Sequence, residues 1–128
     1  MVAEDMVESM VGTTDRVALV CDRDTVIAAS GPDTAFAVGK TVGRAVEKAM
    51  IERQVLLVHY RGGGDASSIL AENDEDLPIV SAAIAPIIVE GDPLGAVVMG
   101  TTSSEHTVGD LEEKLVTTAA GYMARQVN

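Results

Sequence analysis

PIVSAAIAPIIVEGDPLGAVVMGT, residues 78–101, contains two long apolar runs joined by Gly-Asp-Pro at 91–93. Glycine, aspartate and proline each favour a turn for a different backbone reason, so this stretch predicts a β-hairpin with strands at 78–90 and 94–101. Both runs are almost continuously apolar and do not alternate with polar positions. Strands of that kind are usually covered on both faces, so the hairpin predicts a sheet that lies between two other layers.

The other elements follow from the spacing of apolar residues. Two β-rich runs separated by Arg23-Asp24 predict a second hairpin. A stripe of apolar residues at i, i+3, i+4, i+7 and i+8 from Val42 is typical of an amphipathic helix. The remaining expected strands are 17–22, 25–30 and 54–60, the expected helices are 2–11, 42–53 and about 108–127, and Thr107 and Asp110 have the spacing of a capping box.

This order of elements predicts one domain over residues 1–128, with an α/β (α+β) three-layer fold. Short turns between neighbouring strands favour a five-stranded, mainly antiparallel sheet. We expect the terminal helices, within 1–12 and 107–127, to cover one face. The middle helix and the long segment 59–78 would cover the other face.

Charge and composition narrow the classes of function. The chain has 20 acidic and nine basic residues and a net charge of −11. Its basic residues form no cluster, so we expect these residues to make no direct contact with nucleic acid. A single cysteine favours a reducing compartment, and no signal peptide or membrane span is evident. The expected location is the cytoplasm.

The segment HYRGGGDASSILAENDEDLP, residues 59–78, resembles a chemical motif but lacks the necessary partners. Gly62 to Gly64 are followed by an aspartate and no lysine, which argues against a phosphate-binding loop. The acids at 72–76 have no glycine among them, unlike a calcium loop. We interpret them as a solvated surface.

Catalytic and metal-binding patterns are equally weak. His59 and His106 have no second Cys or His at ligand spacing, so structural zinc is not expected. The chain contains no Gly-x-Ser-x-Gly pattern, and Cys21 is expected to be a small buried apolar residue. We therefore predict a domain that is not an enzyme and has no cofactor.

Three stretches carry a resemblance to a known family. ALVCDRDTVIAASG (18–31), IAPIIVEGDPLGAVVM (84–99) and EKLVTTAAGYMARQ (113–126) resemble the carboxy-terminal GAF domains of the stage V sporulation protein T family. Members are transcription regulators of endospore-forming bacteria that join an amino-terminal AbrB-type DNA-binding domain to a GAF domain. The resemblance implies a GAF fold, which is used for sensing small molecules and for dimerisation. No AbrB-like segment occurs in these residues, so DNA binding is expected only through an attached AbrB-type domain.

The candidate ligand-binding residues are Arg61, Phe36, His59, Ser81 and Ser30. Arg61 is the only basic residue between Arg53 and Lys114, and its guanidinium suits an anionic ligand. It can equally neutralise the acids beside it. Phe36 either lines the pocket or fills the core, and the two serines are either wall residues or bonded to the backbone.

The predicted function is a small-molecule-sensing regulatory domain that signals through the geometry of a homodimer or a higher homo-oligomer. An apolar stripe on each terminal helix offers a surface for a second copy. Segment 59–78 would cover the pocket, with a short helical turn at 67–71 that buries Ile69 and Leu70. The alternative is an oligomerisation module with a vestigial pocket and no sensing role.

Overall fold

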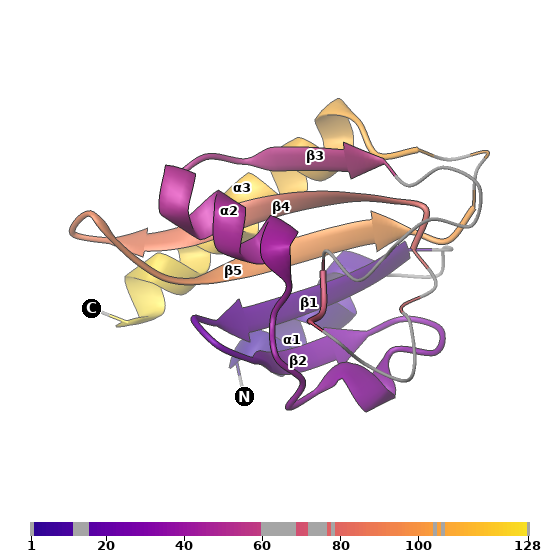
Figure 1. Cartoon of the computed structure of the whole chain (residues 1–128), viewed down its shortest axis with the longest axis horizontal. Helices are drawn as coiled ribbons and strands as arrows, with labels where there is room; N and C mark the ends of the chain where they lie inside the picture. The colour runs from indigo at the N-terminus through magenta and orange to yellow at the C-terminus, as the bar shows by residue number, and fades with distance from the viewer. Residues whose placement is uncertain are drawn as a thin grey trace.

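The computed structural model describes residues 2–11, 16–59, 69–71, 77, 79–103, 105 and 107–127. Its strands form a single sheet in the order β2-β1-β5-β4-β3, and all neighbours are antiparallel. Figure 1 shows the sheet with its helices. The elements are α1 (Val2–Val11), β1 (Arg16–Asp22), β2 (Val26–Ser30), the 3-10 helix η1 (Ala35–Ala37), α2 (Arg44–Glu52), β3 (Leu56–His59), β4 (Ser81–Val89), β5 (Asp92–Thr101) and α3 (Asp110–Val127).

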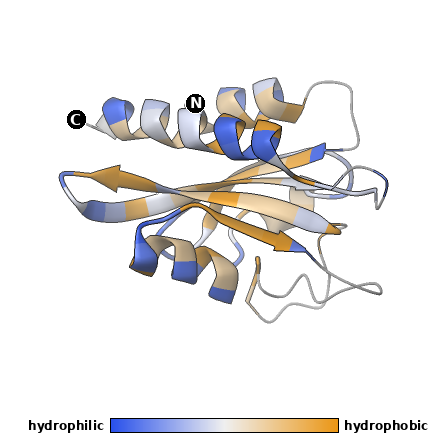
Figure 2. Cartoon of the chain, turned by 90° about the horizontal axis from the view of Figure 1, so that it is seen from above, coloured by the Kyte–Doolittle hydropathy of each residue, from blue (hydrophilic) through white to orange (hydrophobic). Residues whose placement is uncertain are grey.

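The sheet separates two apolar cores, as the continuous apolar strands predict. Helices α1 and α3 lie side by side on one face, and α2 lies on the opposite face (Figure 2). Alternate residues of the central strands supply the two cores: Leu19, Ile84 and Val98 point toward α2, and Val20, Val97 point toward the terminal helices. The expected three-layer fold, with its five-stranded sheet and the placement of all three helices, is confirmed.

The β4–β5 hairpin turns earlier than the sequence predicted. Glu90 and Gly91 form the turn with φ values of 51° and 85°, and Asp92 already belongs to β5. Two positive φ values are typical of a two-residue turn whose twist matches that of the strands. The pairs Ile87↔Gly95 and Ile88↔Pro93 leave an extra residue on β5, so a bulge follows the turn. The expected turn at 91–93 is therefore wrong in position.

The predicted β1–β2 hairpin is confirmed, and Asp22 explains how an Arg-Asp pair can make its turn. The Asp22 carboxylate accepts hydrogen bonds from the backbone N–H groups of Asp24 at 2.8 Å and Thr25 at 2.7 Å. These bonds hold the pKa of Asp22 below its ordinary value, and the bond from Thr25 has the largest effect. Partial burial acts in the opposite direction. The side chain thereby takes the place of a stronger turn-forming residue.

Helix α2 is shorter than the predicted 42–53 because its flanks make other backbone bonds. Thr41 and Val42 form isolated β-bridges with Thr25 and Leu70, so the helix begins only at Arg44. Arg53 ends it in the left-handed conformation, with its N–H donating to the carbonyl of Ala49. The following strand, expected from residue 54, begins at Leu56.

The expected capping box of the last helix is wrong by two residues. Helix α3 begins at Asp110, and Glu113 N–H donates to the carbonyl of Gly109, which places Gly109 at the N-cap. The Glu112 carboxylate accepts the N–H of Gly109 at 2.8 Å. This is the reciprocal half of a capping box, supplied by Glu112 at the third helical position. Thr107 and Asp110 do not form it.

Two glycine substitutions test the close approach of β1 and β5. A Cβ on Gly95 would overlap the carbonyl oxygen of Cys21, so Gly95→Ala is expected to destabilise the fold by about 1–3 kcal/mol. Gly121, inside α3, has room for a Cβ, with its nearest neighbour at 3.8 Å. The control Gly121→Ala is therefore expected to stabilise by about 0.5–1 kcal/mol. Urea unfolding measures both, and equal effects would contradict the packing described.

Candidate functional site

The face beneath α2 is where the GAF resemblance places a ligand, and residues 69–71 lie across it. Gly43 N–H donates to the carbonyl of Ile69 at 2.8 Å, and Ala71 N–H donates to that of Thr41 at 2.9 Å. Ile69 and Leu70 are buried, as predicted. Their backbone makes a β-bridge to Val42, where a helical turn was expected. Residues 67 and 68 lie outside the described residues.

Protein side chains fill this face. Met50 of α2 and the buried Leu77 and Ile79 join Ile69 and Leu70 in one apolar core with the sheet. Phe36, on η1, is partly buried and packs against the same core. A ligand at this position would have to displace apolar side chains of the protein itself.

Ser81 lies on the opposite face of the sheet. It pairs with Thr101 on β5 and alternates with Ala83 and Ala85, which belong to the core beneath α1 and α3. Its buried hydroxyl accepts the N–H of Val108 at 2.9 Å and lies 2.8 Å from the Thr101 hydroxyl. Ser81 therefore connects the start of β4 to the residues that lead into α3.

The five candidate ligand residues do not come together in one place. Ser30 pairs with Ala18 on the terminal-helix side, and His59 pairs with Ser81 at the exposed end of β3. Phe36 is on the α2 side. Arg61 lies outside the described residues. Among the candidates that the structure describes, only Phe36 borders the face beneath α2.

A charged cluster that the sequence reasoning missed holds the start of α3. The Arg16 guanidinium donates to Glu112 Oε2 through Nε at 3.0 Å and Nη2 at 2.8 Å, while Glu112 Oε1 accepts the Gly109 N–H. Glu112 is only 4% exposed. Burial alone would raise the pKa of Glu112, but the hydrogen bonds from Gly109 and Arg16 and the Arg16 charge lower it below its ordinary 4.5. The spacing of Gly109 and Glu112, three residues apart, was the one sequence signal for this cap.

Part of the outer side of the terminal helices is apolar. Exposed side chains at i, i+4 and i+11 of α3 lie on one side of that helix, and Leu111 is 56% exposed. Tyr122 borders a depression of about 260 Å³ together with four residues of α1: Val2, Met6 and the polar Asp5 and Ser9. We call this the helix-pair surface, formed by Val2, Met6, Leu111, Leu115 and Tyr122.

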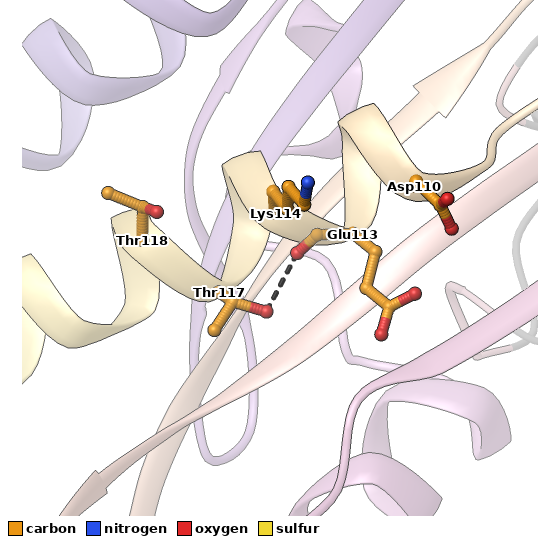
Figure 3. A pocket seen from close by; sticks show the side chains of 5 residues that line it. All are labelled: Asp110, Glu113, Lys114, Thr117 and Thr118. Carbon is orange, nitrogen blue, oxygen red and sulfur yellow. Dashed lines mark hydrogen bonds between the residues drawn. The ribbon is translucent and has the colours of Figure 1, made fainter.

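The other exposed side of α3 is polar (Figure 3). Asp110, Glu113, Lys114, Thr117 and Thr118 border a depression of about 510 Å³. The Thr117 hydroxyl donates to the carbonyl of Glu113 at 2.7 Å, so it is bonded within its own helix. The labelled side chains point in different directions and do not converge on a common centre (Figure 3).

Cys21 is unsuited to nucleophilic chemistry. It is buried in β1, and burial, with a smaller effect of the Asp22 charge, raises the pKa of its thiol to about 12. The thiol is therefore protonated at neutral pH, and the thiolate is the reactive form. Within the described ranges, no three His, Cys, Asp or Glu side chains lie close enough to hold a metal ion, and none of the helices has the length and apolar content to cross a membrane.

The fold belongs to the GAF class. Solved structures with this fold include the second GAF domain of DevS from Mycobacterium smegmatis, at 12% identity and a TM-score of 0.70 over 98% of this chain and 89% of that chain. A GAF domain/HD domain protein from Geobacter sulfurreducens has 19% sequence identity and a TM-score of 0.70, over 98% of this chain and 89% of that chain. The type II free methionine-R-sulfoxide reductase from Thermoplasma acidophilum has 16% sequence identity and a TM-score of 0.63, over 97% of this chain and 88% of that chain. At these identities the likeness is one of fold.

The family is narrower than the fold. A family model described as Stage V sporulation protein T C-terminal, transcription factor, matches residues 1–128, and the chain belongs to that family. Stage V sporulation protein T of Bacillus subtilis (strain 168) is 34% identical over 125 residues. The alignment covers 98% of this chain but 66% of that relative, so the chain spans just under two thirds of the relative's length. The resemblance found in the sequence is confirmed.

Acid titration tests the Glu112 cluster. A carboxyl with a lowered folded-state pKa stabilises the fold fully above its ordinary 4.5, and this contribution is lost as the pH falls through the folded value. Glu112→Gln is therefore expected to cost about 1–3 kcal/mol at pH 7, with the difference from wild type shrinking below about pH 4. Urea unfolding across this range measures it. The exposed Glu105→Gln serves as a control, and a pH-independent difference would contradict the assignment.

Proposed function

We propose that this chain is the regulatory domain of a sporulation-type transcription regulator and acts as a homodimer. The observation that carries this proposal is the helix-pair surface, which leaves large apolar side chains in water on two adjacent helices. A second copy that covers them would complete a four-helix arrangement. The family description and the relative from Bacillus subtilis support a role in transcription. DNA contact would come through an attached AbrB-type domain. The protein would act in the cytoplasm.

In this proposal, small-molecule sensing takes place beneath α2. A ligand that entered there would displace Ile69 and Leu70 from the core and could contact Phe36 and, on the segment that follows β3, Arg61. A ligand shifts an equilibrium between two conformations only if it binds one of them more tightly. In this proposal the conformation with the filled face would be the ligand-free state. Displacement of Ile69 and Leu70 would distinguish the bound state.

The route from this face to the dimer runs through Ser81. Ile79, which packs in the core beneath α2, lies two residues before β4, and Val80 N–H donates to the carbonyl of Thr101 at 2.8 Å. One residue later, the Ser81 hydroxyl accepts the N–H of Val108, just before α3. A shift of β4's first residues would therefore move the start of α3, which carries most of the helix-pair surface.

The second candidate function is an oligomerisation module without a ligand. The filled face beneath α2 favours it, because Ile69, Leu70, Leu77 and Ile79 already satisfy the apolar surface of the sheet. In that case the domain would serve only to form the dimer through the helix-pair surface. The hydrogen bonds of Ser81 would stabilise the fold and transmit no signal.

A charge in the helix-pair surface tests the dimer. Leu115→Glu is expected to convert a dimer into a monomer, because a buried unpaired carboxylate opposes association. Thr117→Glu is the matched control: it adds the same charge to the same helix at an exposed position two residues away, on another side of α3. Sedimentation velocity measures both. A wild-type chain that stays monomeric at high concentration, or loss of the dimer in both variants, would refute this dimer.

A thermal-shift screen separates the two candidate functions. A native-state ligand at 100 times its Kd adds about 2.7 kcal/mol, which raises the Tm of a domain of this size by roughly 5–20 °C. We expect a small anionic metabolite to give such a shift, and Arg61→Ala to reduce it. If no compound in a broad panel raises the Tm and native mass spectrometry finds no co-purified ligand, the domain is an oligomerisation module.

A further inference from the structure

A depression with mixed chemistry lies at the end of the molecule that carries both hairpin turns. The β1–β2 turn, the β4–β5 turn and the last turn of α2 all lie at this end (Figure 1). Between α2 and the β4–β5 turn is a depression of about 420 Å³. It is on the α2 side of the sheet and so is separate from the helix-pair surface.

Two arginines at this depression are held by the same turn. Arg23 Nε donates to the carbonyl of Pro93 at 3.0 Å, and Arg53 Nε donates to that of Gly91 at 2.8 Å. Arg53 Nη1 also donates to the carbonyl of Ile51 at 3.2 Å. These bonds anchor both guanidinium groups, and several of their N–H groups make no hydrogen bond to another described residue. Fixing these long side chains in advance reduces the entropy that binding a partner would cost.

Neither guanidinium has a carboxylate partner within the described part of the chain. The ion pairs between described residues join Arg16 to Glu112 and Lys48 to Glu52. Glu47 and Asp92 also border the depression, but neither forms an ion pair with Arg23 or Arg53. Their negative charges repel a polyanion such as a phosphate chain more strongly than a single carboxylate, and guanidinium groups suit a carboxylate.

One apolar side chain of the depression is exposed. Ile51, on the outer side of the last turn of α2, is 73% exposed and borders the depression with Pro93, whereas Met50 beside it is buried. An exposed aliphatic side chain beside anchored arginines is typical of protein interfaces, where arginine is enriched. Small ligands prefer sites that enclose most of their surface, and this depression is open to solvent.

We propose that this depression docks a segment of a partner protein that presents one carboxylate side chain beside aliphatic ones. The carboxylate accepts hydrogen bonds from Arg23 and Arg53, and the aliphatic side chains cover Ile51. The site is separate from the helix-pair surface, and it shares Met50 with the core beneath α2. It would allow the domain to contact a second protein while the helix-pair surface is occupied by its own copy.

NMR titration of the ¹⁵N-labelled chain tests this docking site. The probe is the peptide Gly-Ser-Leu-Glu-Leu-Ser-Gly with blocked ends, and its matched control has Gln in place of Glu. We expect amide shifts concentrated at 50–53, 91 and 92, and at least about tenfold weaker binding for the Gln peptide. Arg23→Gln with Arg53→Gln is expected to weaken binding by at least about tenfold, whereas the exposed Arg44→Gln at the start of α2 leaves it unchanged.

Three results would overturn the proposal. The first is the absence of shifts at these residues at millimolar peptide, and the second is equal binding of the Glu and Gln peptides. The third is that sodium acetate binds as tightly as the peptide, which would mean that the site takes small carboxylates. If the double variant unfolds, the two single variants replace it, each checked by its Tm, and unchanged affinity in both would equally refute the site.

Discussion

The structure depends on a sheet whose central strands are apolar on both faces. Leu19, Ile84 and Val98 point to one side and Val20, Val97 to the other, so neither face of β1, β4 and β5 can be left in water. Burial of apolar surface is the dominant favourable contribution to folding, and here it requires two layers of helix. Helices α1 and α3 meet this requirement on one face, and α2 with the residues around Ile69 meets it on the other.

The fold could be predicted from sequence because its signals are local and repeated. Apolar spacing identified all three α-helices and all five strands, and short turns implied antiparallel pairing. The errors are at element ends, where single hydrogen bonds decide. Glu112, not Asp110, caps α3, and the β4–β5 turn lies at Glu90 and Gly91 with a bulge after it on β5. Neither a bulge nor a reciprocal cap has a strong signature in the order of residues.

The candidate site was harder to predict because it depends on which face a residue occupies. Ser81 was chosen as a polar residue within an apolar strand, which is a correct observation, but pairing register places it beneath α3. Ser30 likewise lies on the side of the sheet that α1 and α3 cover, because it pairs with Ala18. A one-residue change in register reverses the face of every side chain, and strands that are buried on both faces lack the alternating pattern that would reveal the register. Arg16 and Glu112 are 96 positions apart, so their contact had no local signal.

The sheet order has a consequence for how the chain reaches its folded state. Strand β1 pairs with β5, and Arg16 lies opposite Thr101, 85 positions later. During synthesis the β1–β2 hairpin can therefore form early, but one edge of β1 has no partner until β5 has left the ribosome. Long-range pairings of this kind slow folding, and unpaired strand edges are prone to aggregation. The early hairpin, with the buried strand β1 at its open edge, thus needs protection while the rest of the chain is being made.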